Sequence, residues 1–233
     1  MSTVGVITGL KSEADCLDPL MSFDPAPVVR CAGARPHRVP DLVSGMLELG
    51  CRGIVSFGVT GALVDDLQSG DIVVPASVVS AAGEAWPTDT AWREEIVRAL
   101  EEAKCPVNAG ECLLGSDAAL TSPADKTRAN ASTGAVVVDM ESQAVALATH
   151  VAGVPFVVVR VVADDADTAV PAAAMDAVRP DGSISLLPVI SGLMVRPWTL
   201  GTYLKLGAAN GRAMERLRGL VPVLGPGFRF PLG

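Results

Sequence analysis

The sequence predicts one α/β domain whose central sheet is mixed, mostly parallel and flanked by helices. Short runs rich in Val and Ile recur along the chain with helix-like segments between them, a pattern typical of a sheet covered on both faces. The 233 residues are 49% hydrophobic, so the chain can bury one large core, and its length suits one domain. We expect residues 1–233 to form that domain, with residues 182–220 as a tail that carries an apolar segment and a terminal helix.

Seven segments are predicted as strands because each is a short apolar run bounded by turn residues. They are residues 4–8, 27–32, 53–58, 71–79, 111–115, 135–140 and 155–163. Seven strands in a chain of this length indicate a single large sheet.

Five segments are predicted as helices because their apolar residues return at spacings of three and four. The third begins with Ser122 as the N-cap, Pro123 at the first helical position and Asp125 in the first turn, which is a strong start signal. The five segments are residues 40–49, 90–102, 122–130, 141–151 and 200–220.

Charge and composition exclude several classes of function. The net charge is −8 and no run of Lys and Arg is present, so a nucleic-acid partner is not expected. The first ten residues lack the features of a signal peptide, which predicts a cytoplasmic protein. The cysteines form no CxxC pair and only His37 and His150 are available, so we expect reduced thiols, no metal and no cofactor.

Residues 182–195 form an uncharged segment of 14 residues. Pro188 and Gly192 interrupt it, and it is too short to span a bilayer. It is interpreted as a buried crossover; the alternative is an apolar substrate wall or a shallow patch that contacts a membrane transiently.

Carboxylates follow three of the predicted strands, at the positions where open α/β sheets place their ligands. Glu13 follows the first strand after a short turn, Asp139 and Glu141 end the run VVVDME, and Asp164 ends VVVRVVAD. Each residue has a second interpretation, because an acid at the start of a helix also caps it or interacts with its dipole.

The segment GVTGA, residues 58–62, is predicted as a glycine-bearing turn after a strand. Such a turn can bring backbone N–H groups close to an anion or a sugar hydroxyl. The segment is neither a Walker A sequence nor GxGxxG, so the fingerprints of nucleoside triphosphatases and dinucleotide-binding proteins are absent.

The order of these motifs resembles the nucleoside phosphorylase superfamily, which includes the methylthioadenosine/S-adenosylhomocysteine nucleosidases. The matching motifs are VGVITGLKSEA, IVSFGVTGALVDDLQSGDIVVP, LLGSDAAL, VVVDMESQAVA and VVRVVADDAD, between about residues 3 and 168. The TGLxxEA opening and the tail LLPVISGLMVRPWTLGTYLKLGAANGRAMERL are most similar to the hopanoid-associated phosphorylases, which act on adenosylhopane.

The resemblance implies an enzyme that breaks the bond between a purine and its ribose, and it assigns roles. Asp164 would protonate N7 of the purine, and Glu13 would orient the attacking water. Glu141 would hold the ribose hydroxyls with Met140 packed beside it, and Gly61 and Thr60 would line the substrate site. Protonation of the leaving group and a positioned nucleophile suit the oxocarbenium-like transition state of this cleavage. To act as an acid, Asp164 needs a pKa raised by burial.

The chain departs from its relatives at two places. Ser56 and Val59 stand where the bacterial purine nucleoside phosphorylases keep an arginine and a serine for phosphate. Arg35, His37 and Arg38, or the backbone around Gly58 with Thr60, are candidates for phosphate binding instead, although a solvated turn explains the first three as well. The purine-stacking aromatic residue of the nucleosidases aligns near Ala119, so the base would rest on a smaller side chain such as Leu120.

Three functions remain open. The first is release of adenine from adenosylhopane in hopanoid biosynthesis, by phosphorolysis with phosphate as co-substrate or by hydrolysis. The second is a nucleosidase for small substrates such as methylthioadenosine. The third is a nucleoside sensor that has lost the chemistry. The expected partner is a small-molecule or lipid-linked purine nucleoside, and the resemblance implies a homo-oligomer.

Overall fold

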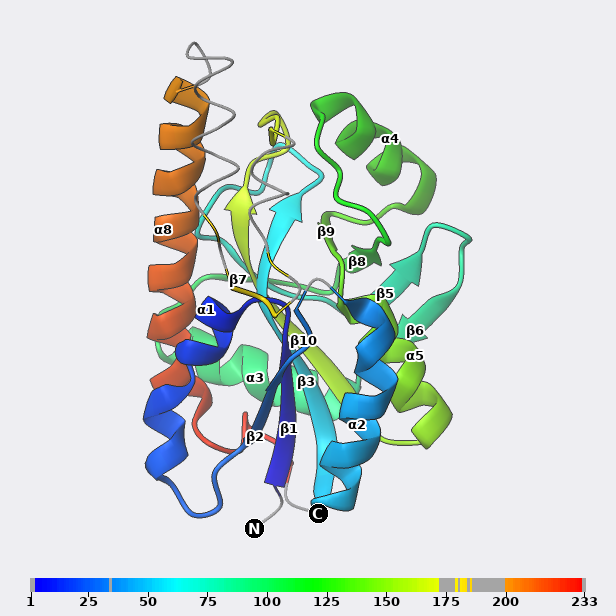
Figure 1. Ribbon diagram of the computed structural model, residues 1–233, viewed down its shortest axis with the longest axis vertical. Helices are drawn as coiled ribbons and strands as arrows, with labels where there is room; N and C mark the ends of the chain where they lie inside the picture. The colour runs from blue at the N-terminus through cyan, green and yellow to red at the C-terminus, as the bar shows by residue number, and fades with distance from the viewer. Residues whose placement is uncertain are drawn as a thin grey trace.

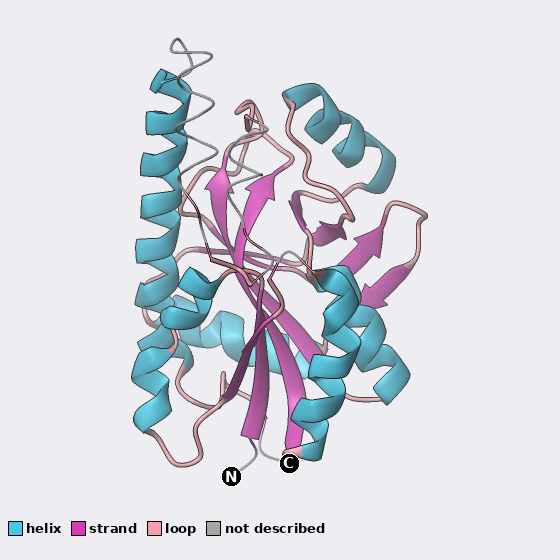
Figure 2. Cartoon of the chain, viewed as in Figure 1, coloured by secondary structure: helices cyan, strands magenta, loops and turns pink. Residues whose placement is uncertain are grey.

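The computed structural model describes residues 3–33, 35–171, 179, 181–183, 185 and 200–231. A central sheet of ten strands lies between helices on both of its faces (Figures 1 and 2). This arrangement confirms the predicted α/β fold class.

The sheet is mixed and mostly parallel. Its strands are β1 (Thr3–Thr8), β2 (Val28–Cys31), β3 (Cys51–Ala62), β4 (Ile72–Val74), β5 (Ser77–Ser80), β6 (Ala85–Pro87), β7 (Val107–Ala109), β8 (Cys112–Gly115), β9 (Val137–Asp139) and β10 (Phe156–Asp164). The order is β6-β5-β8-β9-β3-β10-β4-β7, and β1 pairs with β3 and β2. Among the strands of the described residues, the pairs β10–β4, β3–β9 and β5–β6 are antiparallel and the others are parallel. The long strands β3 and β10 therefore form the centre of the sheet.

Alternate residues of β3 and β10 enter separate hydrophobic cores, as the two-residue period of a strand requires. Val157 and Val159 belong to the core that also contains residues of α3 (Thr90–Glu102) and α8 (Leu200–Leu224). Val158 and Val162 belong to the core with residues of α2 (Val39–Glu48) and α5 (Ser142–Ala152). Figure 1 shows these two helical layers on opposite sides of the strands. Both faces of the central strands are thus buried.

The structure corrects the predicted strands at three places. The single strand predicted over residues 71–79 is two strands, β4 and β5, separated by Pro75 and Ala76; proline has no N–H for the sheet ladder. The short strands β6 and β7 are additional. The turn predicted at Gly58–Ala62 is wrong, because β3 continues through Ala62 in register with β10 and β9.

The helix predictions agree closely with the structure. The predicted N-cap Ser122 accepts a hydrogen bond from the Asp125 N–H and begins α4 (Pro123–Thr133), which ends at Gly134 in the left-handed conformation. Glu141 is the N-cap of α5. The short helices α1 (Lys11–Asp15), η1 (Asp18–Ser22) and η2 (Pro36–Arg38) were not predicted, since each is too short to show a hydrophobic period.

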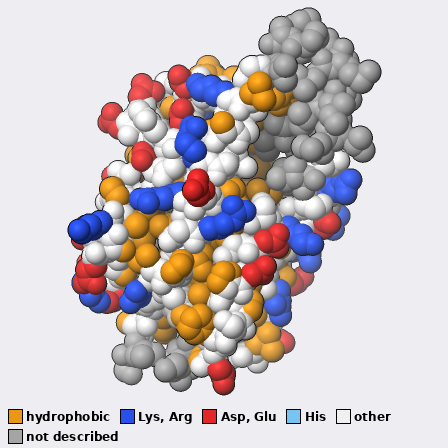
Figure 3. All heavy atoms as spheres, turned by 90° about the vertical axis from the view of Figure 1, so that its left-hand side faces the viewer, with side chains coloured by type: hydrophobic (Ala, Val, Ile, Leu, Met, Phe, Trp, Pro, Cys, Tyr) orange, Lys and Arg blue, Asp and Glu red, His pale blue; other side chains and the backbone are white. Residues whose placement is uncertain are grey.

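Most of the apolar segment 182–195 lies outside the described residues. Its first residue is described: the Gly182 carbonyl accepts a hydrogen bond of 2.9 Å from the Lys11 N–H. Within the described part of the chain, no helix is long and apolar enough to cross a bilayer. Figure 3 shows that hydrophobic and charged side chains are interspersed on the face that includes α8.

Candidate active site

Glu13 connects the turn after β1 to the middle of β3. Its Oε2 accepts hydrogen bonds from the N–H groups of Gly9 (2.9 Å) and Leu10 (2.8 Å). Its Oε1 accepts a hydrogen bond of 2.8 Å from the Val59 N–H. The residue lies in the first turn of α1 and is 2% exposed. Glu13 therefore has the helix-start role that the sequence allows, and it also contacts a second strand.

Arg160 is a fully buried cation in the middle of β10, on the face that packs against α2 and α5. Its Nη2 lies 2.5 Å from Asp139 Oδ2 and donates to Ser56 Oγ (2.8 Å) and Ser142 Oγ (3.1 Å). Its Nε and Nη1 have no hydrogen-bond partner among the described residues. A buried guanidinium with unused donors is costly for a fold unless a ligand meets them.

Glu141 and Asp139 divide the two roles that the sequence left open. Asp139 caps α5, since its Oδ1 accepts from the Ser142 N–H (3.0 Å) and its Oδ2 from the Ser142 hydroxyl (2.5 Å). The Glu141 side chain makes no cap hydrogen bond. Its Oε2 lies 3.8 Å from Arg160 Nη2, and a Cβ at Gly9 would lie 2.5 Å from its Oε1. The Glu141 carboxyl is therefore free to bind a ligand above the β1 turn.

Burial and mutual repulsion change the protonation of this cluster. Burial, with the charge of Asp139 second, raises the pKa of Glu141 to about 8. Burial also raises the pKa of Glu13, against the opposing effect of Arg160. Burial acts to lower the pKa of Arg160, but the carboxylates of Asp139, Glu141 and Glu13 raise it overall. Perturbed carboxyls around one cation are typical of a functional site.

Asp164, at the end of β10, forms a second polar group with Lys126 from α4. Lys126 Nζ lies 2.5 Å from Asp164 Oδ2 and donates to the carbonyls of Asp165 (2.7 Å) and Thr168 (3.2 Å). A Cβ at Gly61 would lie 3.1 Å from Asp164 Oδ2. Burial raises the pKa of Asp164, and Lys126 acts to lower it. The raised pKa agrees in direction with the requirement for a general acid.

The two polar groups lie at different heights along β3. Glu13 and Arg160 fill the space in front of Gly58, while Asp164 lies against Gly61. Three residues of a strand span about 10 Å.

Two of the predicted substrate-binding side chains are already engaged. The Thr60 hydroxyl donates to the Val138 carbonyl at 2.7 Å. Leu120 packs against the hydrophobic cluster that contains Leu63 and Val138. Met140, next to Glu141, is partly buried. The site roles of these residues stay predictions.

The predicted phosphate-binding residues fall into two places. Arg35 and His37 are exposed, and Arg38 is partly buried; they lie in or next to η2, beyond the end of β2. None of the three forms an ion pair with another described residue. At Gly58 the adjacent Val59 N–H already donates to Glu13. The backbone there holds a carboxylate, which competes with phosphate for the same donor.

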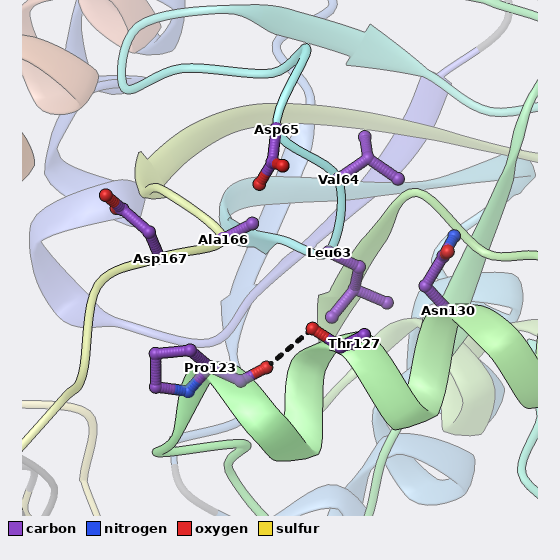
Figure 4. A pocket seen from close by; sticks show the side chains of 8 residues that line it. All are labelled: Leu63, Val64, Asp65, Pro123, Thr127, Asn130, Ala166 and Asp167. Carbon is purple, nitrogen blue, oxygen red and sulfur yellow. Dashed lines mark hydrogen bonds between the residues drawn. The ribbon is translucent and has the colours of Figure 1, made fainter.

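A cavity of about 430 Å³ lies beside the Asp164 group, between α4 and the loops that follow β3 and β10 (Figure 4). Thr127 and Pro123 line its α4 wall, where the Thr127 hydroxyl donates to the Pro123 carbonyl at 3.0 Å. The lining residues are Leu63, Val64, Asp65, Pro123, Thr127, Asn130, Ala166 and Asp167. The cavity flanks the acidic group without including Glu13, Glu141 or Asp164.

The described residues contain no group of three or more His, Cys, Asp and Glu side chains that could hold a metal ion. All five cysteines are free thiols. His150 is exposed in the last turn of α5.

Sequence reasoning missed Arg160 and Lys126. The signal for Arg160 was its position in VVVRVV, because a charged residue inside a strand buried on both faces needs a partner of opposite charge. Lys126 gave no comparable signal, since a lysine in a polar helix is ordinarily solvated. Its burial depends on how α4 packs against the end of β10.

Comparisons with known proteins agree with this fold. The family model of the Phosphorylase superfamily matches residues 41–183. The futalosine hydrolase of Helicobacter pylori is similar over 96% of this chain and 97% of its own, with a TM-score of 0.73 and 14% identity. A search of curated protein sequences finds no match.

Two solved nucleosidases have the same fold. An MTAN variant of Helicobacter pylori with 5′-methylthioadenosine in its active site aligns at a TM-score of 0.68 and 17% identity, over 95% of this chain and 99% of its own. The S-adenosylhomocysteine nucleosidase of Streptococcus pyogenes, in complex with 5-methylthiotubericidin, aligns at a TM-score of 0.69 and 16% identity. The alignment covers 99% of this chain and 98% of the nucleosidase. Because the family model covers more than half of the sequence, the chain belongs to the Phosphorylase superfamily.

Proposed function

We propose that the protein cleaves the N-glycosidic bond of a purine nucleoside, and that it releases adenine from adenosylhopane in hopanoid side-chain biosynthesis. The observation that carries the proposal is the pair of polar groups along β3: Glu13 with Arg160 at Gly58, and Asp164 with Lys126 at Gly61. One group can direct a nucleophile, and the other can protonate a departing base.

The reaction follows from these positions. The C1′–N9 bond breaks and its electron pair moves to the purine, while the proton of the Asp164 carboxyl moves to N7. Water adds its oxygen to C1′ and gives a proton to Glu13.

The charges around Arg160 support hydrolysis over phosphorolysis. Glu13 and Glu141 both lie beside this one guanidinium, so a dianionic phosphate would meet carboxylates as well as the cation. Phosphorolysis would need other donors for the phosphate, such as Arg35, His37 and Arg38, which lie in or next to η2.

Glu141 is suited to hold the ribose hydroxyls. Its side chain has no cap role, and it lies between Arg160 and the Gly9 turn. With its pKa near 8, Glu141 can donate a hydrogen bond to a hydroxyl when protonated and accept one when ionised.

A bulky hydrophobic group on the 5′ side of the ribose is the finer part of the proposal. A small residue, Ala119, replaces the aromatic residue expected beneath the base, and the apolar segment 186–195 supplies candidate contacts outside the described residues. The second candidate is a nucleosidase for methylthioadenosine, favoured by the fold shared with an enzyme that has this nucleoside in its active site. A sensor without activity would have no use for the two sets of acids.

The test is adenine release from adenosylhopane and from methylthioadenosine, each with and without phosphate, measured by chromatography. Release from the hopane compound alone supports the lipid role. Release from methylthioadenosine makes the protein a general nucleosidase, and dependence on phosphate would overturn the hydrolytic step. If neither substrate releases adenine, the remaining interpretation is a nucleoside sensor without activity.

We also propose a homo-oligomer. Leu147 and Val151, one turn apart on α5, are 48% and 79% exposed, and Leu49 after α2 is 60% exposed. Apolar side chains exposed on two neighbouring helices suit a contact with a second copy. Light scattering at micromolar concentration tests this, and a monomer would exclude it.

A further inference from the structure

Lys126 is a buried cation whose donors are all engaged. Its side chain is 1% exposed, and its ammonium group donates to Asp164 Oδ2, the Asp165 carbonyl and the Thr168 carbonyl. An ammonium group has three N–H donors, so none remains for a substrate. Lys126 can act only through the groups that it holds.

The helix that carries Lys126 offers little other reason for burying a charge. Lys126 is the only buried residue of α4, and its neighbours Pro123 and Thr127 line a cavity instead of a packed core. An ammonium group removed from water loses its hydration, which its partners must replace. The position of this charge beside Asp164 points to the chemistry of that carboxyl.

The ion pair leaves one carboxyl oxygen of Asp164 available. Oδ2 is bound to Lys126, whereas no described residue donates to Oδ1. Both oxygens lie against Gly61, at 3.1 and 3.3 Å from its Cβ position. A side chain at this position would press against the carboxyl. Lys126 thus holds the carboxyl by one oxygen and leaves the other free.

We infer that Lys126 is a positioning residue for base release: it holds Asp164 by Oδ2, presents Oδ1 to N7 of the purine and stabilises the carboxylate that remains after proton transfer. The inference rests on the proposed function. In the step, the C1′–N9 electron pair goes to the purine, the carboxyl proton goes to N7, and the Asp164 anion is left facing the ammonium group of Lys126.

The charges around Asp164 leave this role to Lys126. Asp165 is the neighbouring acid, and its Oδ1 accepts from the Ser69 N–H at 2.8 Å. Asp65 and Asp167 line the adjacent cavity (Figure 4). Among the described residues, Lys126 is the only cation paired with Asp164. Without it, both burial and Asp165 would raise the pKa of Asp164 further.

The test compares two leaving groups in the Lys126→Met variant. An ordinary purine nucleoside needs a proton on N7, whereas an N7-methylated purine nucleoside releases a neutral base without one. We expect Lys126→Met to lower kcat about 10- to 100-fold for the ordinary nucleoside, within the range of general acid catalysis, and less than about threefold for the methylated one. The alkaline limb of the pH profile for the ordinary nucleoside should move up by about one unit or more.

Controls separate this role from a structural one. Arg128→Met removes an exposed cation of the same helix, one that pairs with Asp125, and should leave both rates unchanged. In an Asp164→Asn background, Lys126→Met should cost no further activity on the ordinary nucleoside, because Lys126 acts through Asp164. Lys126→Gln provides a second variant of similar length if the methionine variant does not fold.

The outcomes are distinct. Equal losses on both nucleosides with an unshifted pH profile would overturn the inference and leave Lys126 a structural residue. A wild-type protein that cleaves neither nucleoside would instead overturn the proposed function.

Discussion

Replacement of Arg160 by Met tests whether one cation neutralises the buried acids beneath the candidate site. Methionine has a similar length and an apolar stem, so the variant removes the guanidinium with little change in volume. Asp139 then loses its partner at 2.5 Å, and Glu141 and Glu13 lose the nearby positive charge.

The loss of stability depends on pH because these acids are buried. Without a cation beside them, they can avoid a buried charge only by binding a proton. Removing one partner of a buried ion pair costs about 3–5 kcal/mol while the other stays charged. Without Arg160 the pKa values of Glu141 and Glu13 in the folded protein rise further above those of the unfolded chain. The folded variant then binds protons that the unfolded chain releases, and its stability falls as pH increases.

Urea unfolding at pH 5.5 and pH 8 measures this difference. We expect the variant to be less stable than the wild type by about 3–5 kcal/mol at pH 8 and by about 1–2 kcal/mol at pH 5.5. The control Arg98→Met removes an exposed cation, 58% accessible, and should change stability by less than about 0.5 kcal/mol. Equal losses at the two pH values would refute the reasoning, since they would show that the acids do not titrate in response to the guanidinium.

Three further predictions concern the same cluster. Gly58→Ala places a methyl group 2.5 Å from Arg160 Nη1 and against Glu13, and it should lower base release about 100-fold. The matched control is Gly45→Ala, where the added methyl group has nothing within 4 Å. Equal activity of the two variants would contradict the packing argument. Glu141→Gln should be more stable than the wild type at pH 8 but not at pH 5. The folded wild type holds a proton on Glu141 that the unfolded chain releases, so its stability falls as pH rises from 4.5 to about 8, by up to about 1.4 kcal/mol per pH unit. Melting temperatures of variant and wild type that differ equally at both pH values would exclude this. Glu13→Gln should lower hydrolysis about 100-fold or more and phosphate-supported turnover less, and equal losses would remove the role of Glu13 in directing water.

The sequence predicts the strands and acids of this protein better than its cations. Val-rich runs ending in carboxylates predict β10 with Asp164 and the segment with Glu141, because strand burial and strand ends are local features. The GVTGA segment was misinterpreted, since glycine indicates a turn by itself, whereas pairing with β9 and β10 keeps it in β3. Tertiary pairing overrode the local signal.

The two buried cations depend on contacts between distant segments. Arg160 meets Ser56, 104 residues away in sequence, and Lys126 meets Asp164, 38 residues away. No local periodicity encodes such contacts. A buried strand with an arginine at its centre does require an acid nearby, but only the structure identifies Asp139 as that acid.

The central claim is that Asp164 delivers a proton to a departing purine, and it is tested most directly by base release from methylthioadenosine and adenosylhopane with wild type and Asp164→Asn. The account predicts that the wild type releases adenine from at least one of them, and that the variant, assayed at a temperature where its own unfolding curve shows it to be folded, is slower by about 100-fold or more. Adenine release at the wild-type rate by Asp164→Asn would contradict the account.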